Sequence, residues 1–366
     1  MLIRVATVNA SLYRDRSGEL LSELETGKCE QAIALASILQ TVRPDIVLIN
    51  EIDFDQENRC AIVLRDRYIG MSQNGLTPLS YEHLFSAPVN TGIPSNLDLD
   101  GDGRTQGAGD AWGFGRYPGQ YGMVIYSRLP IETEKARTFQ KFLWSHLSGA
   151  LQPSDPVTGK RFHADAVWRR LRLSSKSHWD VPIIVRDQRL HLLASHPTPP
   201  VFDGPEDRNG CRNHDEIAFW SQYIDPASST RFVDDQGRIG SLGDEQAKFV
   251  IVGDLNADPI DGDGRSDAIH RLLSHVGVTD TKPKSLGGRE ACERMGERNL
   301  KHRGDPALDT AEFNAASVGN LRIDYVLPSS NLKVASSGVF WPSPSEPSAQ
   351  WLQGSDHRLV WVDLAL

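Results

Sequence analysis

The stretch KFVIVGDLN, residues 248–256, contains the pattern that decides the fold. An apolar run rich in valine and isoleucine ends here in Gly253-Asp254-Leu255-Asn256. Runs of this length that stop at glycine and aspartate are typical of buried strands followed by a turn. The carboxylate and the amide would then lie at the end of the strand. Taken alone, the motif could also be a simple turn, because Asp, Asn and Gly all favour turns.

Similar apolar runs recur along the chain, and several of them also end in a polar residue. They span residues 2–9, 45–51, 121–127, 190–196, 322–327 and 358–364. Between some of these runs, apolar residues recur at helical spacing. Residues 32–42 form one such pattern, which ends before Pro44, and shorter patterns occupy 214–224 and 269–276, the last closed by Gly277. Strands and helices mixed in this order predict an α/β (α+β) fold with helices packed outside the sheets.

Composition and length favour one globular domain that spans residues 1–366. The chain is 39% hydrophobic and 24% charged, and no linker, internal repeat or low-complexity tract divides it. Long irregular regions lie near 70–120 and 140–182, and both are rich in Gly, Asp, Pro and Ser. Long ordered loops in a compact domain are usually functional, so we interpret these regions as insertions that surround a site.

Polar residues lie at or beside the ends of the predicted strands. Because the ends of neighbouring strands converge in space, these groups could build one pocket. The residues are Asn9, Glu51, His196, Asp254, Asn256, Asp324, Asp356 and His357. Phosphate ester hydrolysis needs such a set: oxygen ligands for a hard cation, a base that takes the proton of water, and groups that stabilise developing charge.

The order of these motifs resembles that of the endonuclease/exonuclease/phosphatase (DNase I-like) superfamily, which includes nucleases, sphingomyelinases and inositol phosphatases. The matching segments are TVN (7–9), LINE (48–51), LASH (193–196), VGDLN (252–256) and GSDH (354–357), with RIDYV (322–326) and residues 121–131 in support. The resemblance implies a four-layer α/β sandwich: two packed, mostly antiparallel β-sheets flanked by helices. It also implies a metal-dependent phosphoesterase.

The resemblance implies that three of these residues serve the metal. Glu51 would be the principal ligand, Asn9 would lie beside it, and Asp356 could contact the ion. Mg²⁺ or Mn²⁺ is expected, as one ion or two, because hard divalent cations take oxygen ligands.

The other matching residues are expected to act on water and phosphate. By resemblance, Asp254 would orient or deprotonate the attacking water, and Asn256 would hold a phosphate oxygen. His196 would stabilise the pentacoordinate phosphorus or assist the leaving group. His357 would contact the phosphate, and Asp324 would orient a catalytic histidine. Attack would be in-line by water, without a covalent enzyme intermediate.

Two features lie outside the matching motifs. Arg172, Lys176 and His178 cluster before a predicted strand, where they could bind substrate phosphate or form a solvated basic loop. Asp98, Asp100 and Asp102, with Asp110 further on, have the spacing of a calcium loop. The first three could hold a structural Ca²⁺ or form a hydrated Asp/Gly turn, since the loop lacks the glutamate of an ordinary EF-hand.

Charge and loop content guide the choice of substrate. The net charge is −9, whereas proteins that grip long nucleic acids usually present a basic face. We therefore expect a monomer that hydrolyses small or lipid-like phosphate mono- or diesters. A nuclease acting on DNA or RNA is the first alternative, and a non-catalytic binding protein on the same fold is the second. No signal peptide or long apolar stretch is visible, so a soluble chain is expected, and export remains open if a leader was removed.

Overall fold

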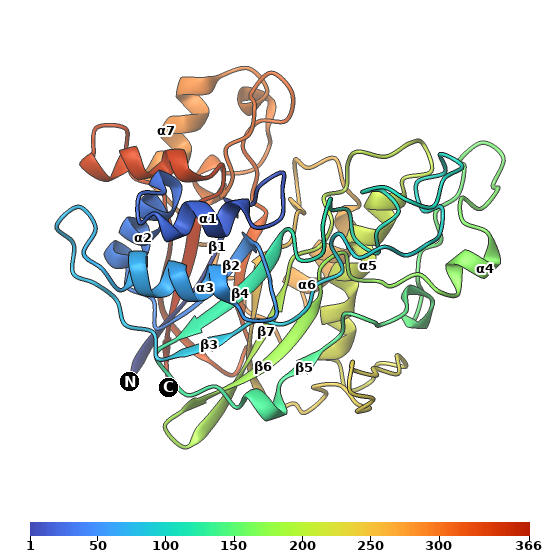
Figure 1. The fold of residues 1–366 in the computed structure, drawn as a ribbon, viewed down its shortest axis with the longest axis horizontal. Coiled ribbons are helices and arrows are strands. Elements are labelled where there is room, and N and C mark those ends of the chain that lie inside the picture. Colours follow the sequence, from blue (N-terminus) through green and yellow to red (C-terminus); the bar gives the residue numbers. More distant parts are fainter.

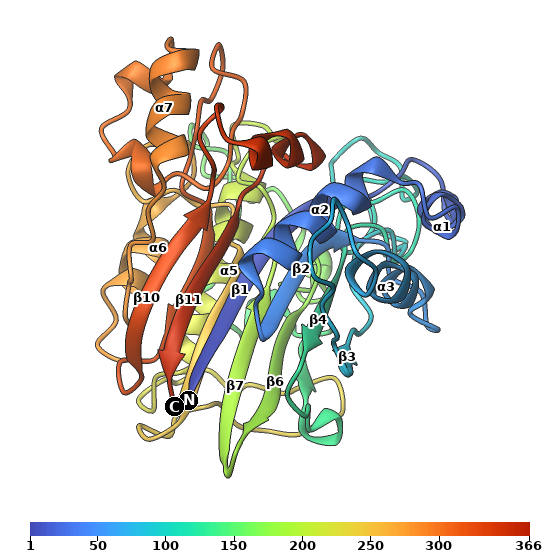
Figure 2. The same cartoon turned by 90° about the vertical axis from the view of Figure 1, so that its left-hand side faces the viewer.

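A computed structural model describes residues 1–366 and contains two β-sheets packed face to face, with helices on their outer faces (Figures 1 and 2). Figure 2 shows both chain ends at the same end of the sheets, where the amino group of Met1 donates to the Leu366 carbonyl at 2.7 Å. No helix has the length and apolar character needed to span a bilayer. The predicted four-layer arrangement is confirmed.

The first sheet has the strand order β10-β11-β1-β2-β4-β3. Its strands are β1 (Leu2–Leu12), β2 (Ile46–Ile52), β3 (His83–Phe85), β4 (Gly122–Ser127), β10 (Lys333–Phe340) and β11 (Leu359–Ala365). Only β1 and β2 pair in parallel, and the other neighbours in this sheet are antiparallel. The antiparallel pairing of β1 with β11 joins the two ends of the chain.

The second sheet has the strand order β5-β6-β7-β8-β9. Its strands are β5 (Arg137–Thr138), β6 (His178–Val185), β7 (Gln188–Ser195), β8 (Lys248–Asp254) and β9 (Asp324–Pro328). Here β7 and β8 are the parallel pair. Both sheets are therefore mostly antiparallel, as the family resemblance implied.

Helices cover the outer face of each sheet (Figures 1 and 2). The first sheet is covered by α1 (Glu19–Glu25), α2 (Glu30–Val42), α3 (Arg59–Leu64) and the π-helix η1 (Arg65–Ile69). The second is covered by α5 (Arg208–Tyr223) and α6 (Ser266–Leu273). The remaining helical elements are α4 (Asp165–Trp168), α7 (Leu286–Met295), η2 (Thr133–Lys135), η3 (Trp144–His146), η4 (Asn299–Lys301), η5 (Pro306–Leu308) and η6 (Pro347–Gly354).

Three hydrophobic cores follow from these layers: one between the sheets and one under the helices on each side. The two cores on either side of strand β8 explain why its sequence is almost continuously apolar. Val250 and Val252 point into the central core, while Phe249 and Ile251 point into the core under α5 and α6. Side chains alternate across a strand, so a strand covered on both faces must be apolar at every position.

Gly253 explains why this run ends in glycine. Its φ is +145°, and an added Cβ would lie 2.0 Å from the Ser195 carbonyl oxygen. The glycine therefore lets the end of β8 approach the end of β7 closely. This approach brings Asp254 and His196, the residues that follow in each chain segment, to the same edge of the sheet.

Some predicted boundaries were wrong. The helix expected at 214–224 begins earlier, at Arg208, and the helix expected to close at Gly277 ends at Leu273. The irregular region expected to reach 182 ends sooner, because β6 begins at His178 and pairs with β7 along its whole length. From 86 to 121, within the irregular region expected near 70–120, the chain contains no helix and no strand.

Candidate metal centre and the adjoining pocket

The strand ends converge on the carboxylate of Asp254, which is 1% exposed. The Asn9 amide on β1 donates to Asp254 Oδ2 at 3.0 Å, and the Asn256 backbone N–H donates to Oδ1 at 2.9 Å. Nε2 of His196 lies 3.4 Å from Oδ2, and Nε2 of His357 lies 3.7 Å from the same atom. Residues from both sheets therefore surround one buried carboxylate.

Glu51 reaches the centre through an irregularity in β2. The strand register shifts between Asn50 and Ile52 in the pairing with β4, so Glu51 is the extra residue, and its φ is +61°. A bulge of this kind aims a side chain differently from the rest of the strand. The carboxylate lies 3.8 Å from His196 Nε2, and burial raises the pKa of the Glu51 carboxyl. A partly buried carboxylate without a bonded cation is a suitable metal ligand.

Asp356 and Asn9 complete the expected metal set. The Ser11 hydroxyl donates to Asp356 Oδ1 at 3.1 Å, and the Asp356 side chain is 49% exposed at the rim of the pocket. Carboxylate and amide oxygens from Glu51, Asp356 and Asn9 are hard donors that fit Mg²⁺ or Mn²⁺. The chain thus carries a donor set suited to a divalent cation.

His357 forms a buried pair with Asp324. Its Nδ1 lies 2.9 Å from Asp324 Oδ2, which also accepts from the Thr310 hydroxyl at 2.9 Å. Burial opposes charge on the ring, but the carboxylates of Asp324 and then Asp254 raise the pKa of His357 to about 10. One potential ligand atom from each of Asp254, Asp324 and His357 lies within 4.8 Å of the other two. Because Asp324 is already bonded to the imidazole and to a hydroxyl, we interpret this trio as a charged histidine held by acids rather than as a metal cluster.

His196 differs from His357 in the charge of its ring. Burial, followed by the Lys176 ammonium and the His357 ring, holds the pKa of His196 well below its usual range. The ring is therefore neutral, and its buried Nδ1 has no hydrogen-bond partner. The two histidines flank Asp254 in different charge states, so they can serve different steps. Burial also raises the pKa of Asp254, to about 7, although the His357 charge opposes this shift.

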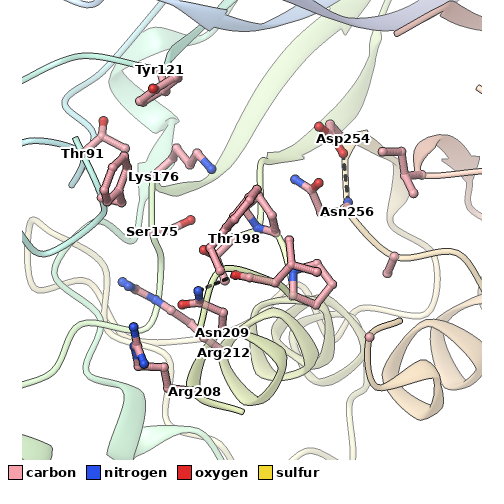
Figure 3. A pocket seen from close by; sticks show the side chains of 18 of the residues that line it. Thr91, Tyr121, Ser175, Lys176, Thr198, Arg208, Asn209, Arg212, Asp254 and Asn256 are labelled. Carbon is pink, nitrogen blue, oxygen red and sulfur yellow. Dashed lines mark hydrogen bonds between the residues drawn. The ribbon is translucent and has the colours of Figure 1, made fainter. Parts of the chain in front are cut away.

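A cavity of about 890 Å³ opens beside these groups (Figure 3). It is lined by Glu51, Asp254, Asn256, Asp356 and His357, and by side chains from the long loops and the start of α5. A volume of this size is typical of pockets for small molecules and cofactors. Both long irregular regions therefore contribute residues to the wall of this cavity.

The three residues predicted to bind phosphate lie in different environments. Lys176 lines the pocket and is 6% exposed. Arg172 does not line it: its guanidinium donates to the Asn90 side chain at 2.7 Å and stacks on Trp112. His178 lies in the core under α5, where its ring nitrogens contact the Ser174 hydroxyl at 2.6 Å and the Glu216 carbonyl at 2.8 Å. Only Lys176 can reach a ligand in this arrangement.

The acidic loop comes together as its spacing suggests. The carboxylates of Asp98, Asp100 and Asp102 lie within 4.8 Å of one another. Asp110 faces inward, is 2% exposed and accepts from the Leu99 N–H at 2.9 Å. Backbone N–H groups of the loop already donate to the Asp98, Asp100 and Asp102 carboxylates, so these bonds alone account for the turn. Calcium at this loop stays a prediction.

The sequence analysis missed helix α5 as the element that holds the site together. The Asn213 amide donates to the carbonyls of Thr198 at 2.8 Å and Leu255 at 2.9 Å. One turn later, the buried Glu216 carboxylate accepts from the N–H groups of Ser175 at 2.5 Å and Thr198 at 2.6 Å. These bonds fix the loops that carry Lys176, His196 and Asn256. The available signal was a polar pair on the same helical face as Ile217 and Trp220.

The model of the Endonuclease/Exonuclease/phosphatase family matches residues 24–357. The chain belongs to this family. Its members are generally metal-dependent hydrolases of phosphate esters, nucleases included. No curated protein matches the sequence.

Two solved structures share the fold at low sequence identity. The endonuclease/exonuclease/phosphatase from Beutenbergia cavernae DSM 12333 is 17% identical with a TM-score of 0.53, over all of this chain and 72% of that one. A family protein from Leptotrichia buccalis C-1013-b is 16% identical with a TM-score of 0.51, over the full length of both chains. At this identity the likeness establishes the fold alone.

Proposed function

We propose that the chain hydrolyses small or lipid-like phosphate mono- or diesters with the help of one or two divalent cations. The observation that carries this proposal is the buried Asp254 carboxylate, which lies between a neutral and a charged histidine beside the Glu51 carboxylate. A divalent cation held by Glu51, Asn9 and Asp356 would supply charge neutralisation and a more acidic water. Mg²⁺ or Mn²⁺ fits these oxygen donors.

The side chains around Asp254 then divide the work. Asp254 orients the attacking water and accepts its proton, because its raised pKa suits a base near neutral pH. The charged His357 donates to a non-bridging phosphate oxygen, where negative charge develops during in-line attack. Asp324 fixes the orientation and the charge of that ring. Asn256 and Lys176 hold the remaining phosphate oxygens, and the neutral His196 lies where it can donate to the phosphoryl group.

The shape of the pocket supports a small substrate over a polynucleotide. A cavity of about 890 Å³ has room for one compact ligand, whereas a nucleic acid needs a basic surface that continues beyond the active site. The net charge of −9 also disfavours tight phosphate backbone binding. A nuclease and a non-catalytic binding protein on the same fold are therefore outcomes of the test rather than the favoured function.

The test compares p-nitrophenyl phosphate, bis-p-nitrophenyl phosphate and supercoiled plasmid as substrates of the same preparation. Each is incubated with EDTA and then with Mg²⁺, Mn²⁺ or Ca²⁺ restored. We expect metal-restored release of p-nitrophenol from at least one ester while the plasmid stays supercoiled. Asp254→Asn is the matched catalytic control, because it keeps the shape of the side chain and removes the base. Plasmid nicking would establish the nuclease instead, and no turnover with any metal would favour the binding protein.

A further inference from the structure

The pocket has two ends of different chemistry (Figure 3). Asp254 and Asn256 lie at one end, while Arg208 and Arg212 from the first turns of α5 lie at the other. The buried His163, from the loop before α4, also lines the pocket. We name His163, Arg208 and Arg212 the basic end. The reaction proposed above uses none of these three residues.

Arg212 is held rigidly at this end. Its Nε donates to the Leu173 carbonyl at 2.8 Å, and its Nη2 donates to the Trp112 carbonyl at 2.6 Å. Its Nη1 has no partner in the protein, and the side chain lines the cavity. A guanidinium that is fixed on one edge and free on the other is prepared for an anion, because little further ordering is required on binding.

Lys176 lies between the two ends, and Figure 3 shows its ammonium group directed into the pocket. The side chain is 6% exposed and makes no hydrogen bond and no ion pair within the protein, although it lies in the pocket wall. A buried cation without a partner is unfavourable. A ligand that brings negative charge into the pocket would remove this cost.

Two cations of the wall share one buried acidic neighbour. Lys176 and Arg212 both lie near the single buried carboxylate of Glu216, which already accepts two backbone N–H groups. Arg208 contacts Glu206 through Nη1 alone, so its Nε and Nη2 can still donate to a ligand in the pocket. Glu51 and Asp254 also attract Lys176. Neither Lys176 nor Arg212 is hydrogen-bonded to a carboxylate, so the N–H groups that face the cavity can donate to an anionic ligand.

The environment of His163 also favours an anionic ligand at the basic end. Burial, followed by the charges of Arg212 and Arg208, lowers the pKa of His163 to about 4. Both guanidinium groups are therefore close to the ring, and the ring is neutral near pH 7. No hydrogen bond within the protein uses its nitrogens, so the ring N–H is available to an acceptor in the pocket.

Apolar side chains line the pocket wall together with these charges. They include Leu99, Ala111, Trp144, Leu171 and Pro200, with the exposed rings of Phe114 and Phe202 also in the lining. Asp100 and Asp263 line it too, and both belong to exposed loops. A ligand that fills this space thus has polar groups at its ends and an apolar or planar body between them.

We propose that the pocket binds a phosphate ester with a second anionic group: the scissile phosphate binds at the metal centre, and the second anion binds at the basic end. This inference rests on the function proposed above and narrows its substrate class to compact phosphate esters that carry a second, separate anionic group. The second anion is a phosphate or a carboxylate, since the free Nη1 of Arg212 and the neutral imidazole N–H can donate to either. Simple monoesters are then poor substrates, because they leave the basic end unused.

The test uses phosphonates, which cannot be hydrolysed, as binding probes for the Mg²⁺-loaded protein. Alkanediyl bisphosphonates with linkers of about four to eight carbons are titrated by calorimetry beside alkylphosphonates of equal length. We expect at least one bisphosphonate to bind about tenfold or more tightly than its matched monophosphonate. Equal affinity at every length would overturn the proposal.

Variants locate the second anion. Arg208→Gln and Arg212→Gln should each remove most of the bisphosphonate advantage, while Arg271→Gln, an exposed arginine on α6, should leave it unchanged. Arg208→Gln keeps the test valid if Arg212→Gln fails to fold, because Arg208 contacts little besides Glu206 and Phe162. A full advantage in Arg208→Gln would place the second anion elsewhere and overturn the assignment.

The hydrolysis assay distinguishes the two proposals. Turnover of p-nitrophenyl esters without any bisphosphonate preference would overturn the second-anion site and leave the phosphoesterase standing. Preferred bisphosphonate binding without turnover of any ester, including the hydrolysable bisphosphate of the preferred length, would overturn the enzyme and leave a dianion-binding pocket.

Discussion

The metal centre takes its side chains from strand ends, whereas the far wall of the pocket takes them from long loops and helix α5. Asn9, Glu51 and Asp254 stand at the ends of strands whose pairing fixes their positions. Lys176 and Arg212 depend instead on hydrogen bonds between segments that are far apart in the sequence. The centre is therefore rigid by virtue of the sheets, and the wall is rigid only while these bonds hold. Substitutions at the metal centre should therefore lower activity with little change in stability, whereas substitutions in the wall should lower both.

The largest effect is expected in the strand-built centre, from Glu51→Gln. The substitution keeps the size of the side chain and removes the charge that holds a divalent cation, so kcat should fall about a thousand-fold or more. The melting temperature should change little, because the strands remain intact. Steady-state kinetics and a thermal melt measure both quantities. Glu57→Gln is the control, since Glu57 is exposed, and a loss below tenfold in Glu51→Gln would contradict its role as metal ligand.

The next effect is expected from His357→Ala, which removes the charged ring that faces the phosphate. The rate should fall about 100- to 1,000-fold, as for other lost donors to developing negative charge. Asp324→Asn should cost less, and it should lower the pKa of His357 from about 10, because Asp324 is the largest influence that raises it. An NMR titration of the His357 ring measures this shift. An unchanged ring pKa would show that Asp254, rather than Asp324, keeps the ring charged.

The same contrast explains what the sequence could predict. Each strand of the centre is a short apolar run, and its functional residue follows within one or two positions, so local patterns locate Asp254, His196 and Glu51. The wall has no such local signal. His178 was placed with the phosphate-binding residues because it follows Lys176 in a polar stretch, yet it begins β6 and packs against Phe219 and Trp220.

Contacts distant in sequence decide the wall. Glu216 binds a loop that lies 41 residues earlier in the chain, and Arg212 binds Trp112 across 100 residues. A single sequence carries no pattern for such pairs. The start of α5 was missed for a related reason: the polar residues Arg208, Asn209 and Arg212 give this turn little apolar periodicity, because they face a pocket rather than a core.

A smaller loss of activity, with a loss of stability, is expected in the wall from Glu216→Gln. The amide keeps one acceptor for the N–H groups of Ser175 and Thr198 but removes the charge that balances Lys176 and Arg212. We expect kcat/KM to fall about tenfold and the free energy of unfolding to fall by about 2–4 kcal/mol. Glu290→Gln, at an exposed position of α7, is the control. If activity fell without any loss of stability, Glu216 would act on the substrate rather than on the loops.

The smallest effect, and the only gain, is expected from Asp309→Asn. Unlike Asp254, whose carboxylate has partners on every side, Asp309 is 9% exposed and its carboxyl makes no hydrogen bond. Burial, followed by the charges of Asp258 and Asp261, raises its pKa to about 8. The native state therefore binds the proton more tightly than the unfolded chain, for which the ordinary value is 3.8. The resulting stability is full below that value and is lost as the pH rises to about 8.

Asparagine keeps the shape of this side chain and cannot ionise, so it should remove the pH dependence. Urea unfolding at pH 4 should give nearly equal stabilities for the two proteins. At pH 8 the variant should be more stable, by an amount on the order of a few kcal/mol. A variant that is less stable at pH 8 would show that the ionised carboxylate has a favourable partner, such as a bound cation beside Asp258. The pocket wall would then contain a second charged site, and the metal centre would no longer be the part of the pocket that alone depends on a cation.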